Sequence, residues 1–456
     1  MTETQVSAQT AYEPTVSTGS VPSAPAREPW SLAKRIGFRL VACYFLLYSF
    51  VPQVVGFIPI VGTVAGWYLR GMQTLTVWTG RNVLHLNASL AIVPTGSGDS
   101  LRGYVQNFVM LSLAVLGTIV WSIFDRRRRE YSRAFDWLTA FVRLTLAITM
   151  FSYGFAKIIP TQMPAPGPDR WIEPLGEYSP MGLLWTFMGY SYVYQIFTGL
   201  GEATGGLLLC FRRTTTAGAL VLIAVLSNVV LLNYTFDVPV KLRSTNLLLM
   251  AVFLLAPDIK RVVDVLVLNR AVGSRELRPL FATRRASRIA MGLVCVLLVI
   301  AVRGDVTRAL TLYGQSSPTG HLPSLFGVYD VVEFTRNGDV VPPLNTDPTR
   351  WSRVAFARFN QVVVRSTPDS VIRFTTRLDD SSKTVSFTSR LDTTLKWTFA
   401  IEKSQSALVP SRDDWIVLRG RVGGDSVVAT LQRVDETRFL LVGRGYHWIQ
   451  EQPFNR

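Results

Sequence analysis

The sequence predicts a membrane all-α protein of about seven transmembrane helices, followed by a C-terminal all-β domain. Hydrophobic residues make up 48% of the 456 residues and charged residues only 17%, a composition too apolar for an ordinary soluble protein of this size. The net charge of +16 would suggest nucleic acid if the basic residues lay on one face, but they alternate with apolar runs. We therefore expect a lipid bilayer as the partner and no nucleic acid.

Seven apolar runs are candidates for membrane spans. An α-helix rises about 1.5 Å per residue, so about 20 residues cross about 30 Å of hydrocarbon. The predicted spans are residues 37–59, 106–124, 137–158, 190–211, 215–235, 244–266 and 288–303. The last run is short. Residues 1–33, rich in Ser, Thr, Pro and Ala, are predicted to be a disordered cytoplasmic tail, and 34–303 the transmembrane domain.

Basic residues gather at one set of helix ends. They lie at 34–35, in DRRRRE at 125–130, at 212–213 and between 260 and 288. Positive charge is retained on the cytoplasmic side of membranes, which predicts a multi-pass protein of the plasma (bacterial inner) membrane with a cytoplasmic N-terminus and an extracytoplasmic C-terminal domain. The alternative, that these runs are buried helices of a large soluble protein, does not explain why every loop obeys this rule.

Two further elements are predicted between the spans. The motif GSGDS at 96–100 is typical of a turn that ends in a helix N-cap at Asp99 or Ser100. The apolar stretch 181–211 is longer than one span needs, so we expect it to break near Gly189, with a short interfacial helix starting at Pro180.

Residues 304–456 are predicted to form an extracytoplasmic β-domain. Apolar residues alternate with polar ones, as in Val385 and Phe387 or Trp397 and Phe399, and turn motifs such as NGD and GGD separate the runs. Short strands at roughly ten-residue spacing with hairpin turns are typical of an up-and-down barrel or a sandwich. We predict a small lipocalin-like barrel, with a sandwich as the alternative.

Polar residues inside the spans are costly and therefore indicate function. Counted from the cytoplasmic ends of their spans, Arg143 lies about 10 Å and Glu202 about 15 Å into the membrane. These depths predict an ion pair of Arg143 with Glu202. Further polar residues are predicted to lie in the outer half and to line a pocket that opens outward, with Glu202 at its floor: Lys157, Gln195, Asn228, Asn233 and Asp237.

Structural explanations stay open for the same residues. Lys157 could extend to the outer headgroups, and Asn228 and Asn233 could serve only as hydrogen bonds between helices. The glycines around Glu202 are explained by close helix packing alone. The three histidines and three cysteines are scattered, so no metal site is predicted, and no catalytic motif occurs in a suitable context.

The motif SYGFAKI at 152–158, followed by GLGEATGGLLLCFRRTTTAGAL at 199–220, resembles the DoxX and DoxD group of membrane proteins. The resemblance covers about residues 137–262. It implies a four-helix core that holds Lys157 and Glu202, and it makes a quinone or a redox partner plausible. It does not extend to the first two spans, the seventh span or the β-domain.

The sequence thus leads to two functional expectations. The first is a membrane protein that binds a quinone or a small amphipathic molecule in the outward pocket as part of a membrane redox system, with Arg143 as the counter-ion of Glu202. The second is a non-catalytic anchor or scaffold that presents the β-domain to an extracytoplasmic protein partner. No residue pattern names a catalytic group or a bound cofactor.

Overall fold

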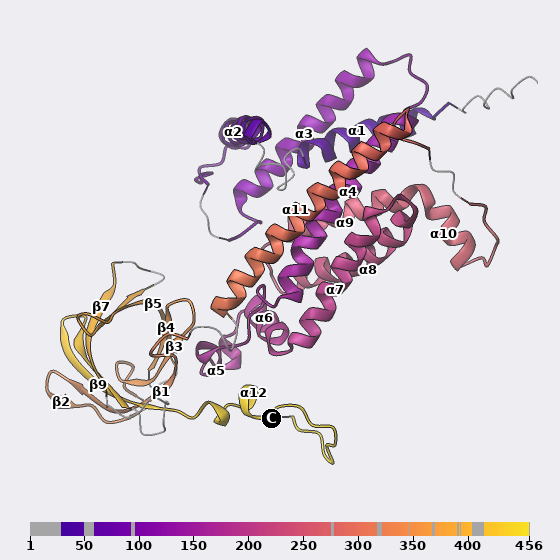
Figure 1. Cartoon of the computed structure of the whole chain (residues 1–456). Helices are drawn as coiled ribbons and strands as arrows, with labels where there is room; N and C mark the ends of the chain where they lie inside the picture. The colour runs from indigo at the N-terminus through magenta and orange to yellow at the C-terminus, as the bar shows by residue number, and fades with distance from the viewer. Residues whose placement is uncertain are drawn as a thin grey trace, which may run out of the picture.

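The computed structural model describes residues 29–49, 59–92, 96–274, 278–316, 322–344, 346–366, 370–389, 392, 394–403 and 415–455. Figure 1 shows a helical part and, at one end of it, a β-barrel. The predicted cytoplasmic tail lies almost wholly outside the described residues. The helices are α1 Leu32–Tyr48, α2 Pro59–Asn82, α3 Leu101–Phe124, α4 Ser132–Ile158, α5 Pro168–Trp171, α6 Pro180–Tyr190, α7 Tyr192–Cys210, α8 Thr215–Thr235, α9 Lys241–Leu255, α10 Ile259–Leu266, α11 Arg284–Ser316 and α12 Leu440–Gly443.

Four of the described helices are long and apolar enough to cross a membrane, so the prediction of seven spans is corrected. They are Leu101–Phe124, Ser132–Ile158, Arg212–Thr235 and Arg284–Gln315. The apolar runs counted in the sequence do not all remain single helices. Within the described residues α1 has 17 residues and α9 has 15, which is about 25 Å and 22 Å of helix, and α7 carries the polar Gln195 and Glu202. Four long apolar helices make the chain a multi-pass membrane protein.

Helices α4 and α7 approach each other closely because glycines face each other at their contact. A Cβ atom on Gly199 would lie 2.7 Å from the carbonyl oxygen of Gly154, and one on Gly154 would lie 2.9 Å from that of Gly199. About two helical turns further along, Gly206 lies against Ala147. Small residues allow two helix backbones to come together in this way inside a membrane, which fixes the level of α4 relative to α7.

The predicted break in residues 181–211 is confirmed. Helix α6 begins at Pro180 behind the N-cap Ser179, and α7 begins at Tyr192 behind the N-cap Ser191. At Gly189 a side chain would collide with the carbonyl oxygen of Pro164, so the turn between the helices packs against the connection after α4. The predicted cap before α3 is also confirmed, at Ser100, which accepts a hydrogen bond from the Gly103 amide.

Helix α11 is longer than predicted. It runs for 33 residues to Ser316, and the predicted domain boundary at residue 303 therefore falls inside it. The helix lies along α4 (Figure 1), where Asp305 accepts a hydrogen bond of 3.1 Å from Ser152. The first strand begins only at Gly327, so the β-domain is shorter than expected.

The β-domain is a closed antiparallel barrel, as predicted, and not a sandwich. Eight strands, β1 and β3–β9, pair in sequence order, and β1 closes the barrel by pairing with β9; the short β2 pairs only with β1. The strands are β1 Gly327–Arg336, β2 Asp339–Val340, β3 Trp351–Ala357, β4 Gln361–Ser366, β5 Val371–Asp379, β6 Thr384–Ser389, β7 Lys396–Lys403, β8 Trp415–Val422 and β9 Asp425–Arg433.

Side chains fill the interior of the barrel. Phe374 and Trp397 pack in a tilted arrangement with ring centroids 4.5 Å apart, and the centroid of the tilted Phe387 ring lies 5.2 Å from that of Phe399. Phe334, Phe374, Phe387 and Phe399 are among the largest fully buried side chains. Aromatic residues contribute strongly to a core through their large buried area. These residues belong to one contiguous hydrophobic core inside the barrel.

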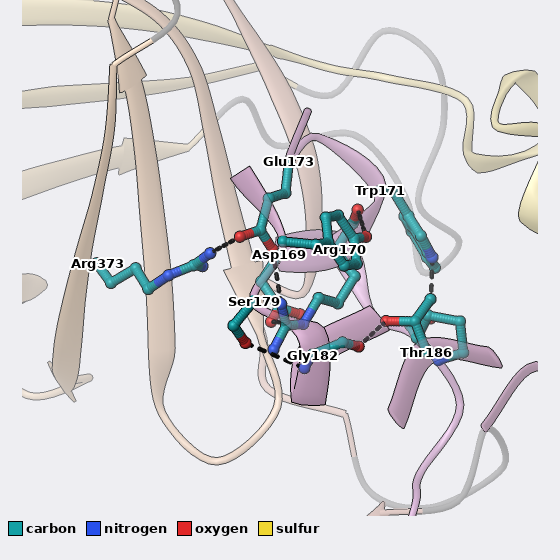
Figure 2. A network of polar contacts seen from close by, with 10 residues as sticks. Asp169, Arg170, Trp171, Glu173, Ser179, Gly182, Thr186 and Arg373 are labelled. Atoms are coloured by element: carbon teal, nitrogen blue, oxygen red, sulfur yellow. Dashed lines mark hydrogen bonds and ion pairs between the residues drawn. The ribbon is translucent and has the colours of Figure 1, made fainter. Parts of the chain in front are cut away.

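The barrel docks on the connection between α4 and α6. Ile172, just after α5, packs among Val328, Ala355 and Val363 on the outer face of β1, β3 and β4. Beside this contact the buried Glu173 binds Arg170 at 2.7 Å and also pairs with Arg373 of β5, as Figure 2 shows. A carboxylate held by two guanidinium groups satisfies its charge despite its burial. The barrel is thus attached by an apolar contact and an ion-pair network.

Candidate functional site

The site begins with a buried ion pair between α4 and α7. The Nζ atom of Lys157, in the last turn of α4, donates to both carboxylate oxygens of Glu202 at 2.7 Å. The two side chains are 8% and 3% exposed. Two charges buried this deeply persist only when they compensate each other, so the close contact at Gly154 and Gly199 positions both groups.

The predicted ion pair of Arg143 with Glu202 is wrong, because Lys157 is the partner of Glu202. The predicted depths hold only if the cytoplasmic ends of α4 and α7 lie in one plane. In the structure Lys157 is level with Gly199, because a Cβ added to Gly199 would lie 2.8 Å from the Cβ of Lys157. Gly199 is about one helical turn from Glu202. Arg143 lies one turn from Ala147, which packs against Gly206, so it is separated from Glu202 by about eight residues of helix, or about 12 Å.

The ion pair forms part of the wall of a cavity of about 820 Å³. The cavity is bounded by α4, α6, α7, α8 and α9 and by the loops after α4 and α8. Of the predicted site residues, Lys157, Glu202, Asn228 and Asn233 line it. Apolar side chains form most of the remaining wall, including Met150, Met163, Leu184, Trp185, Met188, Val225, Leu226, Leu232 and Leu247.

Three predicted site residues do not line this cavity. Arg143 lies deeper along α4, as described above. Gln195 is fully buried, and its Nε2 atom donates to the carbonyl oxygen of Met163 at 2.8 Å, which fixes the connection after α4. Asp237 is 81% exposed and pairs with Lys241 at 2.7 Å. Gln195 thus supports the wall indirectly, while Asp237 belongs to the surface.

Sequence reasoning missed several polar residues of the cavity wall, among them Tyr153, Gln162 and Arg243. The Arg243 guanidinium lies over the Tyr153 ring, 5.7 Å from the ring centroid. The Lys157 ammonium lies 5.9 Å from the same centroid. An aromatic face attracts cations, so Tyr153 holds both of them on one side of the cavity. Arg243 lies in the first turn of α9, two residues after Lys241, and shares the cavity wall with Lys157.

Within the part of the chain that the structure describes, several polar atoms on this wall have no hydrogen-bond partner. They are Nδ2 of Asn233, Nε of Arg243 and Oε1 of Gln162, each of which is shielded from solvent. Most buried polar atoms in proteins are satisfied, and an exception calls for an explanation. A bound molecule with matching groups would supply one.

Comparison with curated proteins gives one relationship to part of the chain. The chain is 37% identical over 128 residues to the uncharacterized protein YwoB of Bacillus subtilis (strain 168), a stretch that is 28% of this chain and 81% of YwoB. The chain belongs to the YwoB family. The match covers 28% of this chain, so the relationship to YwoB concerns one segment and does not extend to the rest of the chain.

The YwoB relationship supplies no activity, because that protein is itself uncharacterized. No family model matches the chain, so the resemblance to the DoxX and DoxD group gains no support. No solved structure matches it either. The chemistry of the site must therefore be argued from its own residues.

The arrangement can bind but offers no evident reaction. Among the described residues there is no group of three His, Cys, Asp or Glu side chains able to hold a metal ion. Lys157 directs two of its N–H bonds to Glu202, and the wall also presents hydrogen-bond donors on Arg243 and Asn233 in a mostly apolar space. A few placed polar groups in a mostly apolar concave space are the usual features of a small-molecule site.

Proposed function

We propose that the chain is a multi-pass plasma-membrane protein that binds a small amphipathic molecule in the cavity beside Lys157 and Glu202. The observation that carries the proposal is the cavity itself, of about 820 Å³, with an apolar wall and a buried ion pair. Ligand pockets in proteins usually enclose about 300–1,000 Å³ and have a few convergent polar groups. The volume and the wall both agree with this description.

The ion pair would act in recognition. The Lys157 ammonium has three N–H bonds, and two of them donate to the Glu202 oxygens. The third can donate to a carbonyl or an anionic oxygen of the ligand. Glu202 would hold the ammonium in place and compensate its charge within the membrane. A quinone is one amphipathic molecule with suitable carbonyl groups; the likeness to the DoxX and DoxD group suggests it, together with a membrane redox role.

The orientation forms part of the proposal. We place the N-terminus in the cytoplasm and the barrel outside the membrane, because the basic clusters then lie on the cytoplasmic side. A cysteine placed at the exposed Val340 of the barrel should react with a membrane-impermeant maleimide in intact cells. Reaction only after the cells are opened would reverse the orientation.

Native mass spectrometry of the protein, extracted gently from its own membrane, tests the binding proposal. The wild type should retain a lipid-sized or quinone-sized adduct, and the Lys157→Met, Glu202→Gln double variant should lose it. Both replacements keep the side chains near their original size, so the shape of the cavity changes little.

A matched control removes a similar ion pair elsewhere. Arg419 and Glu402 pair at 3.1 Å on the exposed surface of the barrel, and the Arg419→Met, Glu402→Gln variant should keep the adduct. Equal retention by the wild type and the cavity double variant would contradict the proposal.

A scaffold is the second candidate function, and the packed barrel interior favours it. Since the interior is filled by Phe374, Phe387, Phe399 and Trp397, the barrel offers its outer surface and loops for contact with a protein partner. If this is the function, a partner that co-purifies with the full-length protein should remain bound when Lys157 and Glu202 are both replaced. Loss of the partner together with the adduct would favour the cavity instead.

A further inference from the structure

We infer that the ligand is an anionic amphiphile whose charged head group lies at Arg243 and Asn233 and whose apolar tail passes between α7 and α8. The inference rests on the proposed function and adds the charge of the ligand and its route. It comes from three observations: the charge balance of the cavity wall, the unpartnered donors on it, and the exposure of the residues along one side.

The cavity wall carries an uncompensated positive charge. Lys157, Arg243 and Glu202 are the charged residues that line it, and Glu202 is occupied on both oxygens by Lys157. Among the residues that the structure describes, Arg243 has a ring contact with Tyr153 but no carboxylate within ion-pair distance. A guanidinium in a largely apolar space favours an anion as its partner.

The unpartnered atoms indicate the same chemistry. Asn233 is 6% exposed, and among the described residues neither its Nδ2 atom nor the Nε atom of Arg243 has an acceptor. Two N–H donors and a cation on one wall match the oxygens of a phosphate or a carboxylate. The acceptor among the unpartnered atoms, Oε1 of Gln162, suits a hydroxyl group on the same head group.

The cavity changes from polar to apolar along its length. Arg243 lies near the start of α9, and Lys157 and Asn233 lie near the ends of α4 and α8. These ends lie together because the three residues share one cavity wall. From Asn233 the wall follows α8 back to Val221, a distance of 12 residues or about 18 Å. A head group at one end and a tail toward Val221 would match this gradient.

One side of the cavity is formed by residues that face the surroundings of the helices. Phe197 and Leu200 of α7 are 69% and 49% exposed, and Ala224 and Asn228 of α8 are also exposed. All four line the cavity, and α7 and α8 lie side by side in Figure 1. In a membrane these helix faces contact lipid, so a tail can enter between them without crossing water.

Quenching of tryptophan fluorescence by brominated amphiphiles tests the inference, because Trp185 lines the cavity. The probes are dibromostearate, which is anionic, and dibromostearamide, which has the same tail and a neutral head group. The purified full-length protein should be quenched saturably by both. The Trp185→Phe variant identifies the part of the signal that comes from the cavity.

We expect dibromostearate to bind about tenfold more tightly than the amide, since a hydrogen bond to a charged group contributes about 1.5 kcal/mol or more. The Arg243→Gln variant should remove most of this preference and retain binding of the amide. Lys241→Gln is the matched control, because this cation lies two residues away, does not line the cavity and pairs with Asp237; it should keep the preference.

Each outcome distinguishes the inference from the proposed function. Equal binding of both probes by the wild type would overturn the anionic head group and leave the cavity as a binding site. No saturable quenching of Trp185 by either probe would overturn the proposed function itself. Unchanged quenching in an Ala224→Phe variant, which narrows the opening between α7 and α8, would overturn the route of the tail.

Discussion

Replacing Glu202 by Gln while Lys157 stays in place should strongly destabilise the helical part. The change removes a carboxylate that binds the Lys157 ammonium through both oxygens at 2.7 Å. The Lys157 side chain is only 8% exposed, so its ammonium would be left buried without a compensating charge. Removing one partner of a buried ion pair costs about 3–5 kcal/mol, chiefly because the other charge is left uncompensated.

The double variant Lys157→Met, Glu202→Gln should be destabilised less than Glu202→Gln alone. No buried charge is left without a partner, and replacing a whole buried pair by groups of similar volume is often close to neutral. The difference between the double variant and the sum of the single variants should therefore give a coupling energy of about 2–3 kcal/mol. Unfolding of the detergent-solubilised protein, followed by far-UV circular dichroism, measures all four members of this cycle.

A coupling energy near zero would refute the reasoning. It would mean that Lys157 finds a new partner or releases its proton in the single variant, so that burial of an unpaired ammonium is not the source of the cost. The exposed pair of Arg419 and Glu402 provides the comparison, because surface ion pairs contribute only about 0.2–1 kcal/mol. The same cycle on that pair should show little coupling.

Four further outcomes are expected. Gly199→Val should separate α4 from α7 and abolish ligand retention, because even a Cβ would lie 2.7 Å from the Gly154 carbonyl oxygen; native mass spectrometry measures it. Phe399→Ala should cost the barrel about 3–5 kcal/mol in denaturant unfolding, since Phe399 is fully buried. Glu173→Gln should loosen the barrel from α5, because Arg373 loses its partner; faster proteolysis of the residues between α11 and β1 measures it. Hydrogen bonds, of which that from the Ser381 side chain is the strongest, lower the pKa of Asp379 to about 2. Its contribution to the stability of the barrel is therefore complete above the unfolded pKa of about 3.9 and is lost as the pH falls from there toward about 2. The Asp379→Asn variant should lack this component in acid unfolding.

The parts of the fold that depend on local patterns were predictable. Alternation in the β-domain predicted strands because inward residues such as Phe387 and Phe399 recur at every second position along β6 and β7. The break between α6 and α7 followed from length and from Pro180 at a first helical position. These signals lie within ten or so residues, so no knowledge of distant contacts was needed.

The site was only partly predictable because its geometry depends on how helices are placed against each other. Lys157 and Glu202 were both recognised because a charged side chain inside a membrane is energetically costly. The predicted partner of Glu202 was wrong, since Gly154 and Gly199 set the level of α4 relative to α7. Arg243 was missed because it lies at the start of a helix, where a cation normally reaches water. The quinone and the redox role stay predictions.

The connection between α4 and α6 links the cavity to the barrel. Its first part contributes Gln162 and Met163 to the cavity wall, and Gln195 of α7 binds the Met163 carbonyl oxygen. Its second part contributes α5 and Glu173 to the contact with the barrel. Fewer than ten residues separate Met163 from Ile172, and Gly189 packs against Pro164 between them. A displacement of the barrel would therefore pull on a wall of the cavity, and filling the cavity would restrain the segment on which the barrel docks. The two proposed functions need not be separate, since a ligand in the membrane and a partner outside it would act on the same short segment.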